Sequence, residues 1–177
     1  MSAEIWTWCV TAYDRAGVAD ICLSLQDEDG QNVPLLLWAA WLASEGVVLD
    51  ESLAGEAVGM TRIWSESLIS PLRQVRRRLK TELTADDEDA RLPLRQKIKG
   101  LELEAERTLL QILGRQGYGE NYENTHKNQN FNALMTQNLQ TIASAWGAEV
   151  PKKRLLQLAE ALSEGGILSY NAPVQSL

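Results

Sequence analysis

Val33-Pro34-Leu35-Leu36-Leu37-Trp38-Ala39-Ala40-Trp41-Leu42-Ala43 is the longest apolar stretch of the chain. It is too short to cross a bilayer, which takes about 20 apolar residues. A helix built from it is apolar on every side, and such a helix is normally surrounded by other helices. Asn32 can cap its first turn, and Pro34 falls where a missing N–H costs nothing. The stretch therefore predicts a central core helix, Leu35 to Ser44.

Apolar residues recur at helical spacing on both sides of this stretch. The predicted helical segments are residues 3–14, 18–28, 50–83, 87–115, 131–146 and 152–163. No two-residue alternation is long enough to indicate a strand. We expect an all-α fold, a single domain over residues 1–177 with six or seven bundled helices. Residues 117–130 are predicted to form a polar loop, and residues 165–177 a frayed tail.

Two apolar stripes flank an acidic turn at residues 84–89. Their spacing of three and four residues is that of the a and d positions of a coiled coil. The stripes are Leu68, Leu72, Val75, Leu79 and Leu83, then Leu94, Ile98, Leu101, Ala105, Thr108 and Ile112. They predict a long antiparallel helical hairpin from Ile69 to Arg115, kinked at Pro71.

Charge is distributed unevenly along the chain, whose net charge is −7. Residues 1–60 contain one base and ten acids, and residues 61–115 contain twelve bases and nine acids. An acidic chain is a poor general phosphate binder, so this balance argues against nucleic acid as the partner. The segregation instead favours a protein partner for the basic segment.

Four cations share one helical face after Pro71, and the nearest aromatic residue is Trp64. The cations are Arg73, Arg76, Arg77 and Lys80. We predict that these five residues bind an acidic patch of a protein partner. Two alternatives stay open: the arginines bind nucleic acid or phosphate, or they pair with acids of their own chain. Glu102, Glu104 and Glu106 are expected to approach them as exposed pairs, each worth about 0–1 kcal/mol.

Motifs of catalysis and cofactor binding are absent from the sequence. The chain has one histidine, His126, and no phosphate loop, HExxH, CxxC or GxSxG pattern. We therefore predict no catalytic residues, no cofactor and no metal. One alternative is kept: a small-molecule enzyme with a pocket lined by tryptophans and by Glu102 to Glu106.

The two cysteines, Cys9 and Cys22, lie inside apolar patterns. They are expected to be buried free thiols in a reducing compartment rather than a regulatory disulfide. The first residues carry an acid in place of the basic region of a secretory signal. These observations predict a cytoplasmic protein with no membrane contact.

Short segments spread over the first two thirds of the chain carry a family resemblance. They include Gly17-Val18-Ala19, Cys22 to Asp27, Leu35 to Leu42, Pro71-Leu72-Arg73, Arg76-Arg77 and Leu101 to Glu106. Over about residues 1–115 the chain resembles an uncharacterised bacterial family, the domain of unknown function 2390. The resemblance implies a small helical cytosolic protein of proteobacterial type and implies no activity. We expect a non-enzymatic interaction or regulatory module, and self-association stays open.

Overall fold

The computed structural model describes residues 2–84, 86–116, 131–147 and 149–163, and within them the chain is helical with no strand. The elements are α1 (Ser2–Tyr13), α2 (Val18–Asp27), α3 (Val33–Ser44), α4 (Glu51–Trp64), the π-helical η1 (Ser65–Ile69), α5 (Ser70–Arg78), α6 (Glu88–Gln116), α7 (Phe131–Trp146) and α8 (Lys152–Ser163). Because α4, η1 and α5 are continuous, these described elements make seven helices. The all-α prediction is confirmed, whereas the predicted loop 117–130 and tail 165–177 lie outside the described residues.

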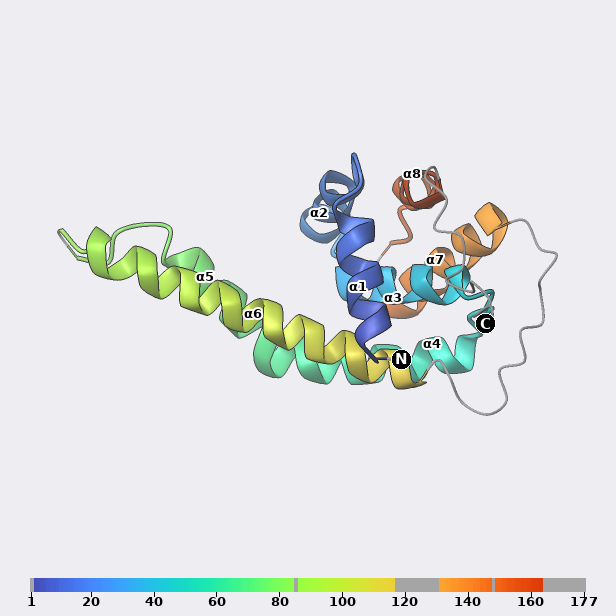
Figure 1. The fold of residues 1–177 in the computed structure, drawn as a ribbon, viewed down its shortest axis with the longest axis horizontal. Coiled ribbons are helices and arrows are strands. Elements are labelled where there is room, and N and C mark those ends of the chain that lie inside the picture. The colour runs from blue at the N-terminus through green and yellow to red at the C-terminus, as the bar shows by residue number, and fades with distance from the viewer. Residues whose placement is uncertain (1, 85, 117–130, 148, 164–177) are drawn as a thin grey trace, which may run out of the picture.

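The central helix of the bundle is α3, as predicted. Every residue from Pro34 to Ala43 is buried, and Figure 1 shows α3 between α1 and α7. The Asn32 side chain accepts a hydrogen bond from the Leu35 N–H at 3.1 Å and so caps the helix. The Trp38 Nε1–H donates to the Leu113 carbonyl of α6 at 3.0 Å, which joins the core to the hairpin. None of the described helices is both long enough and apolar enough to cross a bilayer.

A buried asparagine of α7 connects three backbone segments. The Asn138 Oδ1 accepts from the Leu49 N–H at 2.9 Å. Its Nδ2 donates to the Ala39 carbonyl of α3 at 3.2 Å and to the Val47 carbonyl at 2.9 Å. The loop between α3 and α4 is therefore held against α7 by side-chain hydrogen bonds, since backbone groups buried in a loop need partners.

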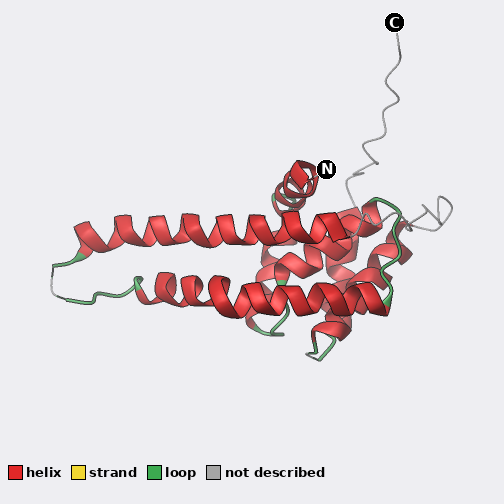
Figure 2. Cartoon of the chain, turned by 90° about the horizontal axis from the view of Figure 1, so that it is seen from below, coloured by secondary structure: helices red, strands yellow, loops and turns green. Residues whose placement is uncertain are grey.

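The hairpin is antiparallel, as predicted, and projects from the bundle. Figures 1 and 2 show α5 and the first half of α6 side by side, extending beyond the other helices. We call residues 70–103 the arm. The helix continues through Pro71, where a kink was predicted, and the irregular, wider π-helical turn η1 lies directly before it.

The predicted seam of the hairpin is only partly correct, since Leu79 and Ala105 are buried but other members of the two stripes are exposed. Leu68, Val75, Leu83, Leu94 and Leu101 were expected to face the partner helix, and all five are exposed. Ala105 is the one member of the α6 stripe among the buried residues of that helix, which are Arg91, Glu102, Ala105, Leu109, Leu110, Leu113 and Gly114. The reason is that α6 packs on α1 and α3 as well as on α5, so its buried face lies between these neighbours.

The far end of the arm is closed by one carboxylate. Asp87 accepts from the N–H groups of Leu83 and Thr84 at 2.7 and 3.0 Å, and from the Arg91 Nε–H at 2.7 Å. The buried Arg91 also donates to the Leu79 carbonyl at 2.8 Å. The hydrogen bond from Arg91 and those from the two N–H groups lower the pKa of Asp87 to about 2.

We expect Asp87→Ala to open this end of the arm without unfolding the bundle. The Leu83 and Thr84 amides lose their acceptor and should exchange with solvent at nearly unprotected rates, whereas α3 amides keep their protection. Hydrogen exchange followed by NMR measures both. Asp89→Ala is the matched control, because Asp89 is an exposed acid two residues further on. Unchanged protection of Leu83 in the Asp87 variant would contradict the assignment.

Candidate functional site

A pocket of about 560 Å³ lies at the base of the arm, where α1, α2 and α3 meet the hairpin. We call it the base pocket. Its polar lining residues are Tyr13, Asp14, Gln26, Arg73, Arg76, Lys99, Glu102 and Glu106, and its apolar lining includes Trp6, Val10, Leu23, Leu37, Leu103 and Leu110. A volume of this size is within the range of small-molecule sites. The sequence left open a small-molecule pocket lined by tryptophan and by Glu102 to Glu106. The base pocket is its counterpart in the structure, with Trp6, Glu102 and Glu106 in its lining.

The apolar wall of the base pocket is open to solvent. Val10, Leu23 and Leu103, from three different helices, are 41%, 47% and 50% exposed. Trp6 is half-buried and stacks with Arg107, whose guanidinium carbon lies 5.4 Å from the ring centroid, whereas Trp8 belongs to the core. Cys9 is a buried free thiol at this wall, and burial raises its pKa. The wall offers apolar surface that the described chain leaves uncovered.

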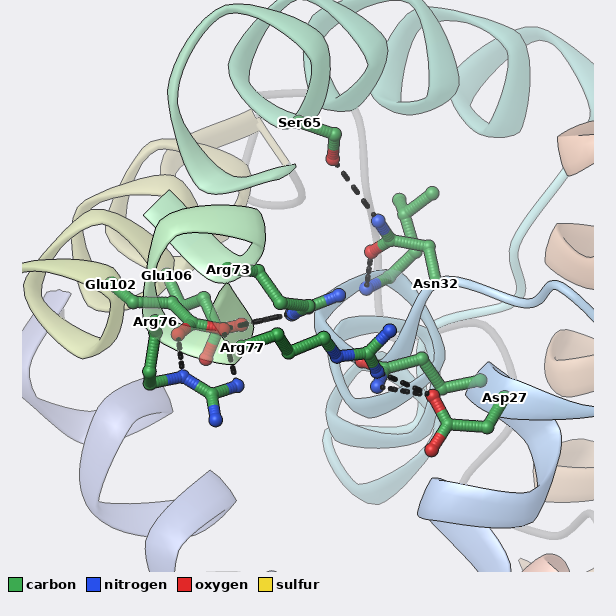
Figure 3. A network of polar contacts seen from close by, with 10 residues as sticks. Asp27, Asn32, Ser65, Arg73, Arg76, Arg77, Glu102 and Glu106 are labelled. Carbon is green, nitrogen blue, oxygen red and sulfur yellow. Dashed lines mark hydrogen bonds and ion pairs between the residues drawn. The ribbon is translucent and has the colours of Figure 1, made fainter. Parts of the chain in front are cut away.

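The polar wall is a network of two arginines and two glutamates (Figure 3). The Arg73 Nε–H donates to Glu102 Oε1 at 2.8 Å and its Nη2–H to Glu106 Oε1 at 2.7 Å. Arg76 donates to both oxygens of Glu102. Glu102 is only 8% exposed, so these pairs are not the weak surface pairs that the sequence indicated. The network fixes the rotation of α5 against α6.

The two glutamates differ in their electrostatic environment. Burial alone would raise the pKa of Glu102, but hydrogen bonds and charge from Arg76 and Arg73 outweigh burial and lower it. Burial raises the pKa of Glu106 above its usual value, against the opposing charge of Arg73 and with the added repulsion of Glu102. Glu102 is therefore the firmly ionised member of the pair, and Glu106 takes up a proton more readily.

We expect Glu102→Gln to destabilise the protein at pH 7 and Glu106→Gln not to destabilise it. A carboxyl whose pKa is lowered by folding contributes stability above its unfolded pKa and loses it as pH falls through the folded value. Glu102→Gln should cost about 2 kcal/mol at pH 7 and flatten the acid limb of the stability curve. Folding raises the pKa of Glu106, so its ionised form opposes folding at pH 7. Glu106→Gln should therefore leave the free energy of unfolding unchanged or increase it. Urea unfolding from pH 7 down to pH 3 checks both, and equal losses would contradict this reading.

The five residues predicted from the sequence to bind a partner do not form one surface. Arg73 and Arg76 line the base pocket and are held by internal carboxylates, which was one of the open alternatives. Arg77 pairs with Asp27 of α2 at 3.0 Å, with the two side chains 54% and 52% exposed. Lys80 is exposed on the arm, and Trp64 is half-buried against the core.

An exposed apolar stripe on the arm was missed by the sequence analysis. Val75, Leu94 and Leu101 are 48%, 48% and 56% exposed. Leu94 and Leu101 are seven residues apart on one face of α6, and Val75 of α5 follows seven residues after Leu68 of η1, just before the arm. We call Leu68, Val75, Leu94 and Leu101 the arm stripe. The heptad spacing was recognised, but it was assigned to the interior of the hairpin.

The fold and the base pocket together define an all-α protein in which a helical bundle carries a projecting helical hairpin. The chain belongs to the family described as protein of unknown function (DUF2390), whose model matches residues 4–113. No curated protein and no solved structure matches the chain. The match confirms the family resemblance and contains the whole base pocket and arm, whereas α7 and α8 lie beyond it. Its description assigns no activity, and a proteobacterial origin stays a prediction.

Proposed function

We propose that the chain is a protein-interaction module whose arm binds an amphipathic, acidic helix of a partner protein. The observation that carries the proposal is the exposure of Val75, Leu94 and Leu101 on a hairpin that projects beyond the bundle. Apolar stripes with heptad spacing are the surfaces on which helices pack together. The arm stripe is the apolar half of such a site.

The charges beside the arm stripe indicate the chemistry of the partner. Arg78, Lys80 and Lys97 are exposed on the arm, and no ion pair joins them to another described residue. Arg73 and Arg76 line the base pocket and pair with Glu102 and Glu106, so the proposal of a partner helix rests on the cations further along the arm. A helix with leucines on one face and glutamates beside them complements this surface.

The proposal is tested with two synthetic helical peptides that share a leucine face. One has glutamates beside the leucines and the other has lysines, and binding to the full chain is followed by fluorescence anisotropy. We expect binding of the acidic peptide only, weakened by salt. Leu94→Glu with Leu101→Glu should lower the affinity at least about tenfold, or about 1.4 kcal/mol.

Leu92→Glu with Leu103→Glu is the matched control. Both leucines are exposed on α6, on the face opposite to Leu94 and Leu101, so this variant should bind the acidic peptide as before. Equal binding of both peptides, or of neither, would overturn the proposal. A dimer that dissociates on substitution of Leu94 and Leu101 would also overturn the proposal, because the arm would then bind a second copy of the chain. Binding of duplex DNA through Lys80 and Lys97 would overturn it as well.

A bacterial cytoplasm is the compartment we propose for this module. The support is that Cys9 and Cys22 are free, buried thiols, together with the family resemblance. Fractionation of cells that express the chain, followed by thiol labelling after denaturation, tests this. Two labelled thiols in the cytoplasmic fraction are expected, and an oxidised pair in another fraction would contradict it.

A further inference from the structure

We propose that the base pocket binds a small amphipathic anion, a molecule with an apolar body and a single carboxylate. The carboxylate is bound by the guanidinium groups of Arg73 and Arg76, and the apolar body lies against Val10, Leu23 and Leu103. This site is separate from the arm stripe, and its ligand does not depend on the partner proposed above.

The shape and lining of the pocket fit such a ligand. Sites for small molecules are concave, mostly apolar and supplied with a few convergent polar groups. The base pocket has about 560 Å³ of space and an apolar wall contributed by α1, α2 and α6. Its charged side chains come mainly from α5 and α6, and Asp14 follows α1, so the pocket offers both apolar and charged surface.

The arginines retain hydrogen-bond donors for a head group. The network uses Nε and Nη2 of Arg73 and the same two atoms of Arg76. No hydrogen bond from Nη1 of either arginine reaches another residue in the part of the chain that is described. Guanidinium groups bind carboxylates through paired N–H donors. Glu102 holds both groups in place, so a ligand meets donors whose orientation is already set.

Bases and acids are equal in number in the lining of the base pocket, so protonation of one carboxyl decides whether the pocket favours an anion. Arg73, Arg76 and Lys99 line it together with Asp14, Glu102 and Glu106. Arginine does not release its proton, and Glu102 is held ionised by both arginines. Glu106 is the carboxyl that gains a proton most readily, and this makes the pocket more positive. An incoming carboxylate can therefore be accommodated by protonation of Glu106.

The groups that face Glu106 come from three helices. They are Arg73 and Arg76 of α5, Glu102 of α6 and Tyr13 of α1. Burial, and after it the nearby carboxylates, raise the pKa of Tyr13, so this phenol remains neutral near pH 7. The proton taken up on binding is thus assigned to Glu106, and affinity for the anion should rise as pH falls towards the raised pKa of this carboxyl.

The test uses three probes with one tail: decanoate, 1-decanol and decylammonium. Isothermal titration calorimetry on the full chain, in two buffers of different ionisation enthalpy, gives affinity and proton uptake together. We expect decanoate to bind at least about tenfold more tightly than decylammonium, with uptake of a proton. The affinity of decanol should lie between those of decanoate and decylammonium, because decanol has the same apolar tail and no charge.

Glu106→Gln separates this mechanism from a non-specific apolar site. The variant removes the opposing carboxylate, so decanoate should bind about tenfold more tightly and without proton uptake. Leu103→Glu should abolish binding by placing a carboxylate on the apolar wall, whereas Leu101→Glu is the matched control, exposed on the other face of α6.

Three results would overturn the inference. They are decylammonium binding as tightly as decanoate, no binding of any probe, and Glu106→Gln leaving affinity and proton uptake unchanged. None of them bears on the peptide site of the arm stripe, since Leu94 and Leu101 do not line the pocket. Equally, loss of peptide binding in the Leu94 and Leu101 variant leaves decanoate binding intact.

Discussion

Replacing Trp38 by alanine is expected to lower the free energy of unfolding by about 4 kcal/mol, the range found for buried tryptophan. Trp38 is fully buried in the middle of α3. Its loss leaves a cavity where α3 meets α6, and it also removes the donor to the Leu113 carbonyl. Single domains have a total stability of roughly 5–15 kcal/mol, so this one change removes a large part of it.

Urea unfolding followed by circular dichroism measures this loss. Trp38→Phe fills most of the cavity and loses only the hydrogen bond, so it should cost about 1–2 kcal/mol. Leu156→Ala is the control for loss of an exposed apolar side chain on α8, and it should change stability by less than about 1 kcal/mol. A loss below about 1 kcal/mol for Trp38→Ala would mean that α3 is not the centre of the core.

Replacing Asn138 by alanine is expected to cost about 3 kcal/mol, although the side chain is small and polar. The substitution leaves the buried N–H of Leu49 without its acceptor, and the carbonyls of Val47 and Ala39 without this donor. A buried polar group left without a partner costs about 1–3 kcal/mol. The loop between α3 and α4 should then loosen from α7.

The control for Asn138 is its neighbour Gln137, which is exposed on the same helix. Gln137→Ala should be neutral within about 0.5 kcal/mol. Hydrogen exchange adds a local readout, since the Leu49 amide should lose protection in the Asn138 variant alone. Protection of Leu49 that survives Asn138→Ala would show that the hydrogen bond is not what holds this loop.

Local signals predicted most of the helix boundaries. Asn32 and Asp50 cap α3 and α4 as the sequence indicated, each accepting an N–H three residues further on. The predicted limits 131–146 and 152–163 are those of α7 and α8. Such signals are reliable because a cap or a left-handed glycine acts within a few residues of chain.

The packing of the hairpin could not be predicted in the same way. Leu94 and Leu101 have the spacing of a seam, and nothing local distinguishes them from Ala105 and Leu109, which are buried. Glu102 was expected at the surface because carboxylates are rarely buried without partners. Its burial depends on two arginines of another helix, and that is a property of the assembled fold.

By itself the sequence determined that this chain is all-α, which helix is central and where most helices begin and end. Each of these follows from apolar spacing and from capping groups a few residues apart. The tertiary structure decided which face of the hairpin is exposed, and that Arg73 and Arg76 line a pocket. These outcomes depend on competition between α1, α3 and α5 for the surface of α6, and such competition exists only once the helices have packed.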